Sequence, residues 1–244
     1  MPVETTFLIL LLLVAMLYAI VGHGGASGYI ALMVMFAFSF TSIKPTALIL
    51  NIVVSLLGFL LFYKAGYFKW KLFWPLILTS VPAAFVGGFF KFNQPFVNNV
   101  LAVILLYSSI QLVRKNKVTS SSESIEISKF YLLAIGALVG FLSGMLGIGG
   151  GIILSPLLIL FKGVDARSTA AISAPFIFFN SASGLIAFSV SGGSIPPNIF
   201  AYVAVVMVGG LIGSTLGSKG VSLYGLRLVL AGTVAFAAFK LISI

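Results

Sequence analysis

Apolar segments follow one another along almost the whole chain, and one polar stretch divides them into two sets of five. The segments cover residues 5–22, 29–41, 45–63, 72–90, 96–113, 130–146, 152–161, 169–190, 199–216 and 223–242. Eight of them are long enough, or nearly so, to span about 30 Å of hydrocarbon as helices that rise about 1.5 Å per residue. Segments 29–41 and 152–161 are too short. The pattern predicts an all-α, polytopic membrane helix bundle.

The polar stretch is a linker between two similar parts of the chain. It reads RKNKVTSSSESIEISK over residues 114–129, and its serines and mixed charges are typical of a solvated loop. We therefore expect a first transmembrane repeat over residues 1–113 and a second over residues 130–244. The segment 5–22 has Glu4 and no basic residue before it, so we interpret it as the first membrane helix.

Matching motifs indicate that the two halves arose by duplication. GHGGA at residues 22–26 corresponds to GIGGG at 147–151, and each is followed by a short apolar segment, a basic residue and a long helix. The basic residue is Lys44 or Arg167, and the long helices carry Ser55-x-x-Gly58 and Ser181-x-x-Gly184. Five segments per half is an odd number, so the halves would be inverted relative to each other, as in many secondary transporters.

Composition and charge make the membrane assignment firm. Hydrophobic residues make up 60% of the chain and charged residues 7%, and the mean hydropathy is +1.21, so lipid must be the main solvent. The net charge of +10 is typical of basic cytoplasmic loops, and nucleic-acid binding is the poorer interpretation. With no cysteine, one histidine and four acidic residues, the chain offers no convincing catalytic set, metal site or cofactor site.

The distribution of basic residues predicts the topology. If each short segment either crosses the membrane or returns as a re-entrant hairpin, one face holds Lys64, Lys69, Lys71, Arg114, Lys115, Lys117, Lys129, Lys162, Arg167, Lys219 and Arg227. The other face holds Lys44, Lys91 and Lys240. This predicts that the linker lies on the cytoplasmic side of the cell membrane. Crossing and re-entrant versions place the loops on the same sides, so charge does not separate them.

The two glycine-rich stretches are predicted to break helices around an anion site. Non-helical backbone at membrane depth survives where it lines a cavity or packs in protein. The short helices expected to begin near Tyr29 and Ile152 would aim free N–H groups at a bound anion. The candidate residues are Gly22, His23, Gly24, Gly25, Ser27, Gly147, Gly149, Gly150 and Gly151. For the pairs Gly87-Gly88 and Gly209-Gly210 we favour close helix packing.

Polar side chains elsewhere complete the candidate site. His23 either donates to the anion, carries a coupled proton, or bonds a carbonyl of the break as a structural residue. Lys44 and Arg167, on opposite faces, would draw anions into the two vestibules, although both could simply flank the membrane and Arg167 could pair with Asp165. Asn51, Ser55, Asn180 and Ser181 lie inside the long helices, where they line the site or bond neighbouring helices.

The second half resembles a known family. The run GALVGFLSGMLGIGGG at residues 136–151, followed by Ser155-Pro156 and the stretch from Arg167 to Ala170, is similar to the signature of the TauE/SafE sulfite exporters, also called the toluene-sulfonate uptake permease group. The resemblance implies transport of sulfite, sulfonates or related organosulfur anions. His23 and Ala26 depart from the second-half pattern of Ile148 and Gly151. A passive anion channel is the alternative, and the direction of transport and the formation of a homodimer are left open.

Overall fold

The computed structural model describes residues 3–90, 94–113, 128–160, 164–197 and 199–219, with single positions between 231 and 242. Most of the linker predicted at residues 114–129 lies outside this part of the chain. So does most of the tenth apolar segment. The basic residues Lys91, Arg114, Lys115, Lys117, Lys162, Arg227 and Lys240 also lie outside the described residues.

Helices make up the regular structure of the described chain, in agreement with the prediction. They are α1 (Val3–Ile20), α2 (Ala26–Met35), α3 (Phe40–Lys64), α4 (Trp70–Phe89), α5 (Gln94–Val113), α6 (Lys129–Leu146), α7 (Gly151–Leu160), α8 (Ala166–Val190) and α9 (Ile199–Ser218). Of these, α3, α4, α6, α8 and α9 are long and apolar enough to cross a membrane. The all-α, polytopic membrane bundle is confirmed.

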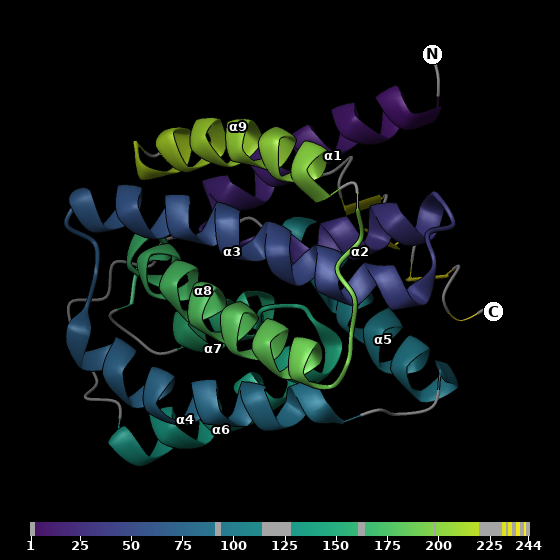
Figure 1. The fold of residues 1–244 in the computed structure, drawn as a ribbon. Helices are drawn as coiled ribbons and strands as arrows, with labels where there is room; N and C mark the ends of the chain where they lie inside the picture. Colours follow the sequence, from purple (N-terminus) through teal and green to yellow (C-terminus); the bar gives the residue numbers. More distant parts are fainter. Residues whose placement is uncertain are drawn as a thin grey trace.

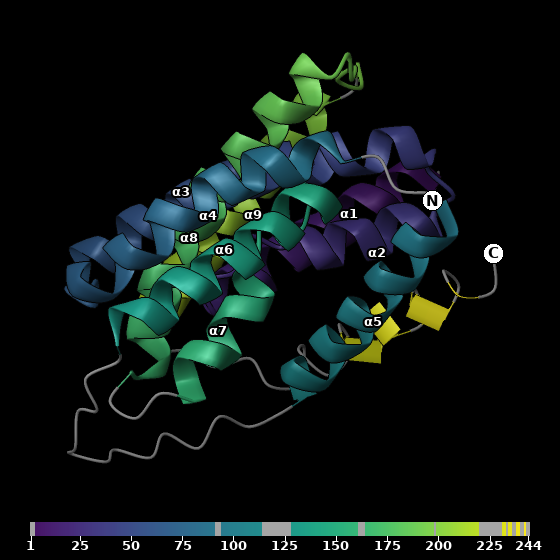
Figure 2. The same cartoon turned by 90° about the horizontal axis from the view of Figure 1, so that it is seen from below.

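The bundle is layered around two central helices. Figure 1 shows α1 and α9 along one side, α4 and α6 along the opposite side, and α3 and α8 between them. In Figure 2, α5 lies at the edge beside α2, which it contacts. The central pair α3 and α8 contacts both outer pairs, so these two helices connect all parts of the fold.

Both short helices turn back along the helix before them. In the first half, the Ser27 hydroxyl of α2 donates to the Tyr18 hydroxyl of α1 at 2.9 Å, and the Phe7 and Phe36 rings meet at the other end with centroids 5.3 Å apart. In the second half, α7 contacts α6, and Leu154 and Leu158 of α7 share a buried apolar cluster with Leu132 and Val139 of α6. Each short helix has 10 residues, or about 15 Å, which is about half of a bilayer core. The structure therefore favours re-entrant hairpins over full crossings.

The central helices α3 and α8 run antiparallel. A methyl group built on Gly58 of α3 would lie 3.5 Å from the Ala174 side chain of α8, and one built on Gly184 of α8 would lie 3.7 Å from the Leu48 side chain of α3. Residue numbers thus rise along one helix as they fall along the other. Because both helices have 25 residues, Gly58 occupies the same position in α3 as Gly184 does in α8, and the two contacts are equivalent.

The outer helices repeat this reciprocity. Helix α4 packs on α6 and α8, and its counterpart α9 packs on α1 and α3. If α1, α3 and α4 are exchanged for α6, α8 and α9, this set of contacts stays the same. A pseudo-two-fold relation between the halves would produce such a pattern, although their inversion and the repeat boundaries stay predictions.

Glycine stripes hold the outer pairs together. Along α6, Gly136, Gly140 and Gly144 face the backbone carbonyls of Leu76, Ser80 and Ala84 in α4. Along α9, Gly209, Gly213 and Gly217 face the backbone carbonyls of Leu12, Met16 and Ile20 in α1. Small residues let helix backbones approach closely in membranes, and each of these pairs joins one helix from each half.

The glycine pairs of α4 and α9 also pack closely, as predicted. Gly87 faces the Phe141 carbonyl of α6, and Gly88 faces Ala187 of α8. In α9, a methyl group on Gly210 would lie 3.2 Å from the Val54 side chain of α3. The packing interpretation of Gly87-Gly88 and Gly209-Gly210 is confirmed.

Basic residues gather at one end of the bundle. Helix α3 ends at Lys64, and α4 and α8 begin at the same end of the bundle. Helix α6 runs parallel to α4 and so begins there, and α9 runs parallel to α3 and so ends there. This end, called the basic end below, carries Lys64, Lys69, Lys71, Lys129, Arg167 and Lys219. Lys44 lies toward the other end, near the start of α3. The described residues divide between the ends as the sequence predicts.

Candidate functional site

Two glycine turns interrupt the re-entrant hairpins. The first break spans residues 21–25 and has positive φ at Gly22 (72°) and Gly25 (100°). The second spans residues 147–150 and has positive φ at Gly147 (76°), Gly149 (71°) and Gly150 (79°). Glycine adopts these angles without a steric penalty, so the predicted tight turns are confirmed. The short helices begin slightly earlier than expected, which places Ser27 inside α2.

The breaks converge on the same two side chains at the crossing of α3 and α8. A methyl group on Gly24 would press against the Asn51 amide oxygen and lie 2.9 Å from Ile177 Cγ2. One on Gly149 would lie 2.5 Å from Asn51 Nδ2 and 2.8 Å from Ile177 Cγ2. The fold therefore brings one break from each half to opposite edges of the Asn51 amide, near the middle of α3. Both glycines are packed against protein in this conformation.

Each central helix carries a buried amide: Asn51 lies at the meeting point of the breaks, and Asn180 bonds α4. Asn51 Nδ2 donates to the Ser181 hydroxyl at 3.4 Å, and Asn180 Nδ2 donates to the Ser80 hydroxyl at 3.1 Å and to the Phe176 carbonyl at 2.7 Å. Within the described chain, the side-chain oxygens of Asn51 and Asn180 are buried without a hydrogen-bond donor. Leaving such an acceptor unpaired costs about 1–3 kcal/mol. The site thus holds unused hydrogen-bonding capacity in its interior.

His23 extends from the first break to the second. Its Cδ2 atom would lie 3.5 Å from a methyl group on Gly151, the first residue of α7. Its ring meets the Tyr18 ring edge to face with centroids 6.4 Å apart. The only histidine of the chain is therefore half-buried at the junction of the two hairpins, next to the N-terminus of a short helix.

The two recurring serines have different surroundings. Ser181 accepts the hydrogen bond from Asn51, whereas the Ser55 hydroxyl donates to the Ile52 carbonyl of its own helix at 3.4 Å. The Ser27 hydroxyl is bonded to Tyr18. Of the three predicted serines, the structure brings Ser181 to the meeting point of the breaks, and it directs the hydroxyls of Ser27 and Ser55 to other partners.

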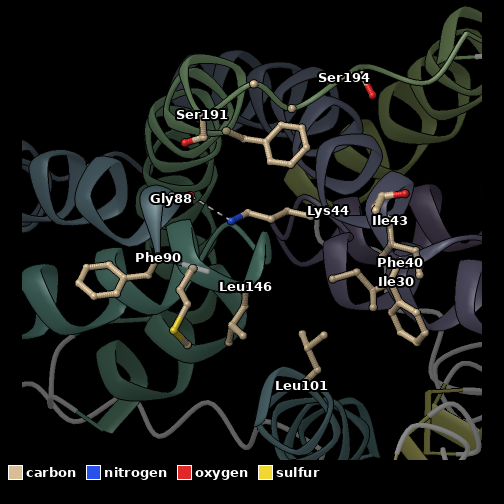
Figure 3. Close-up of a pocket in the computed structure, with 15 residues that line it drawn as sticks. Ile30, Phe40, Ile43, Lys44, Gly88, Phe90, Leu101, Leu146, Ser191 and Ser194 are labelled. Carbon is tan, nitrogen blue, oxygen red and sulfur yellow. Dashed lines mark hydrogen bonds between the residues drawn. The ribbon is translucent and has the colours of Figure 1, made fainter. Parts of the chain in front are cut away.

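Lys44 lines a cavity at the end of the bundle away from the basic end. The cavity has a volume of about 520 Å³ and lies between the start of α3, the ends of α4, α6 and α8, and α5 (Figure 3). Lys44 Nζ lies 3.5 Å from the Gly88 carbonyl, and its Cγ would lie 2.9 Å from a methyl group on Gly147. Of the predicted site residues, Lys44 is the one that lines this cavity, and its side chain also packs on Gly147 of the second break.

Arg167 lies at the basic end, with its side chain turned to an aromatic residue. Its Nη1 donates to the Tyr67 hydroxyl at 2.6 Å, and its Cζ lies 5.3 Å from the centre of the Tyr67 ring. The alternative that Arg167 pairs with Asp165 holds for its backbone, because the Asp165 carboxylate accepts the backbone N–H of Arg167 at 2.8 Å, whereas the guanidinium bonds Tyr67. Gly22 packs on Ala170 as Gly147 packs on Lys44, so Lys44 corresponds in position to Ala170 and not to Arg167.

Asp165 caps α8, and its loss should destabilise the basic end. Burial raises the pKa of its carboxyl, but hydrogen bonds from Ser168 and Arg167 and the charge of Lys69 outweigh burial and hold the pKa below its usual value. The stabilisation is therefore present above the unfolded-state pKa and is lost as the pH falls through the folded-state pKa. We expect Asp165→Ala to cost about 1 kcal/mol and Asp165→Ser to cost less, measured by thermal unfolding in detergent. An equal loss in both variants would contradict the capping role.

Several residues of the site have no distinctive sequence signal. Ser80 bonds Asn180, the buried Ser143 lies beside Gly150, and Ile177 supplies the apolar wall against both breaks. A polar residue inside an apolar segment is a weak signal that would have included Ser80 and Ser143. Nothing in the sequence distinguishes Ile177 from its apolar neighbours.

Comparison with known proteins decides the family. The family model of the sulfite exporter TauE/SafE matches residues 7–241. The chain belongs to this family. The TauE/SafE chain is 36% identical to the probable membrane transporter protein y4hK of Sinorhizobium fredii over 94% of both chains. It is 26% identical to a probable membrane transporter of Methanocaldococcus jannaschii over 76% of this chain and 74% of that one.

A more distant relative is TauE/SafE family protein 5 of Arabidopsis thaliana, which is 30% identical over 38% of this chain and 20% of its own. No solved structure matches the chain. The family match and the five membrane-spanning helices together make the TauE/SafE chain a multi-pass protein of a membrane transporter family.

Proposed function

We propose that this TauE/SafE protein is a proton-linked secondary transporter that moves a small sulfur-containing anion, such as sulfite or a sulfonate, across the cell membrane. The observation that carries the proposal is the convergence of both glycine breaks on the Asn51 amide. In transporters, paired helix breaks near the centre of the bundle form the substrate site. The sulfur chemistry rests on the family name.

Hydrogen-bond donors around the breaks suit an anion. Helices α2 and α7 begin at the breaks, where the first N–H groups of a helix lack intrahelical acceptors and the helix dipole is positive. No side chain caps the start of α2. The Asn51 amide and the Ser181 hydroxyl add donors from the central helices. The substrate would enter where Gly24 and Gly149 now pack on Asn51, so this conformation is a closed one.

Access would alternate between the two ends. Lys44 lies at the cavity on one end and Arg167 at the basic end, and a basic residue at a low-dielectric opening raises the local anion concentration. The glycine stripes join α6 to α4 and α9 to α1. The moving parts would therefore be these cross-half pairs, each with its short helix, turning against the central pair α3 and α8. The basic end would face the cytoplasm.

Flux of sulfite into proteoliposomes tests the function and the role of His23 together. We expect saturable sulfite flux that rises with an imposed pH gradient in the wild type. In His23→Ala we expect saturable flux that no longer follows the gradient, because histidine is the side chain that changes charge near neutral pH. An equally folded His23→Ala sample, checked by its unfolding temperature, is required for the comparison.

The outcomes separate the parts of the proposal. Gradient dependence that survives in His23→Ala would show that the proton travels with the substrate and would remove His23 from the coupling step. Flux that rises linearly with concentration would indicate a passive channel. Absence of flux for both sulfite and methanesulfonate would overturn the substrate assignment.

A further inference from the structure

The cavity beside Lys44 has walls that a small inorganic anion does not need. Its lining is mostly apolar and includes Phe40, Phe90, Leu101, Met145 and Phe188. Figure 3 shows Leu101 and Leu146 on one side of the Lys44 side chain and Ser191 and Ser194 on the other. Among the described residues that line the cavity, Lys44 is the charged one. This part of the lining thus combines the Lys44 ammonium group with a large apolar surface.

The size of the cavity fits an organic ligand. Its volume of about 520 Å³ lies within the range of about 300–1,000 Å³ that is usual for sites that bury organic molecules between apolar walls and a few polar groups. An oxyanion such as sulfite has four heavy atoms and would leave most of this volume unfilled. The apolar walls gain binding free energy only from a ligand that removes them from water.

The charge arrangement fits a single negative charge. The ammonium group of Lys44 has three donors, and its hydrogen bond to Gly88 is long, at 3.5 Å. Among the described residues no carboxylate forms a salt bridge with it. A lysine acts as a compact point charge and lacks the planar fork by which arginine matches a particular oxyanion. The site should therefore attract one anionic group without selecting between carboxylate and sulfonate.

We propose that this cavity binds an amphiphilic monoanion, carboxylate or sulfonate alike, with its charged group at Lys44 and its apolar body against Phe90, Leu101 and Phe188. The inference deepens the proposed function, because Lys44 also covers Gly147 and so lies between the cavity and the second break. A ligand held here would occupy the approach to the central site from the end opposite the basic end. Selection at this point depends on the apolar body and not on sulfur.

Binding of matched long and short anions tests the proposal. The probes are octanoate and octanesulfonate against acetate and methanesulfonate, with the protein in phosphatidylcholine nanodiscs and binding measured by equilibrium dialysis against empty nanodiscs. We expect both eight-carbon anions to bind at least tenfold more tightly than their short counterparts and within about threefold of each other. Equal binding of long and short anions would overturn the inference.

Two variants assign the binding to this cavity. Lys44→Met keeps the apolar stem and removes the charge, and Leu101→Trp fills the volume, so each should weaken octanoate binding at least tenfold. Lys64→Met removes an exposed lysine at the basic end and serves as the matched control, for which we expect no change. Unfolding temperatures establish that the variants are folded. Unchanged octanoate affinity in folded Lys44→Met and Leu101→Trp would overturn the proposal.

Lipid competition identifies the source of the ligand. If addition of phosphatidylglycerol to the nanodiscs displaces octanoate from wild type, the natural amphiphile is an anionic lipid. If it does not, the site takes free organic anions. Both results keep the amphiphilic class. Because binding is measured without transport, its failure is distinguishable from failure of sulfite flux in proteoliposomes, which concerns the central site.

Discussion

Gly149→Ala should reduce sulfite flux by at least tenfold. Gly149 has φ +71°, where a side chain costs about 1–2 kcal/mol. Its methyl group would also lie 2.5 Å from Asn51 Nδ2 and 2.8 Å from Ile177, and forcing atoms into a packed interior costs about 1–3 kcal/mol more. The break would therefore shift away from Asn51 and distort the place where both halves meet. Initial flux rates and unfolding temperatures of the purified variant measure the effect.

Gly66→Ala is the matched control for this variant. Gly66 has φ +80°, but a methyl group there would have no neighbour within 4 Å. It therefore carries the backbone strain of Gly149→Ala without the clash. We expect slightly lower stability and wild-type flux. If Gly66→Ala lost as much flux as Gly149→Ala, contact with Asn51 would not be the cause.

Gly144→Leu should prevent recovery of stable, monodisperse protein. A side chain at Gly144 would meet the Ala84 carbonyl of α4 directly, so the two backbones would have to separate. The other contacts of the stripe, from Gly136 and Gly140, would be lost with it. Overpacking of this kind costs about 1–3 kcal/mol even where side chains can adjust, and a backbone carbonyl adjusts less. Size-exclusion profiles and unfolding temperature in detergent provide the readout.

Ala134→Leu places the same side chain on the exposed face of α6 and should behave like the wild type. The contrast between the two leucine variants separates the α4–α6 contact from a general intolerance of α6 to large residues. Normal folding of Gly144→Leu would show that the fold does not need the close approach of α4 and α6. It would also contradict the proposal that these two helices move as one unit.

The order of the helices and the location of their breaks were predictable from local patterns. Apolar segments, the polar linker and the glycine motifs each depend on neighbouring residues. The helices begin and end within about six residues of the predicted segments, and the largest differences are at the end of α2 and the start of α3. The need for small residues at Gly87 and Gly209 was also predictable, because close helix packing in membranes favours glycine.

The meeting of the breaks at Asn51 was only partly predictable. Asn51 and Gly149 are far apart in sequence, and their contact depends on how the two hairpins dock on α3 and α8. Lys44 follows Gly22 by 22 residues, whereas Arg167 follows Gly147 by 20 and Ala170 follows it by 23, so shared charge and not equal spacing paired Lys44 with Arg167. The Arg167 side chain turns to Tyr67 and not to Asp165, because Asp165 already caps the helix through backbone N–H groups. These outcomes depend on tertiary packing.

Counterflow in proteoliposomes tests most directly whether the paired breaks form an alternating-access site for a sulfur anion. Vesicles are loaded with unlabelled sulfite, diluted into a trace of labelled sulfite, and followed over time. With an alternating-access site, label should accumulate transiently above its equilibrium level, because a site that releases unlabelled sulfite outside returns with labelled sulfite. We expect this overshoot to be lost in Gly149→Ala but not in Gly66→Ala. Label that only equilibrates, at the same rate with or without internal sulfite, would contradict alternating access.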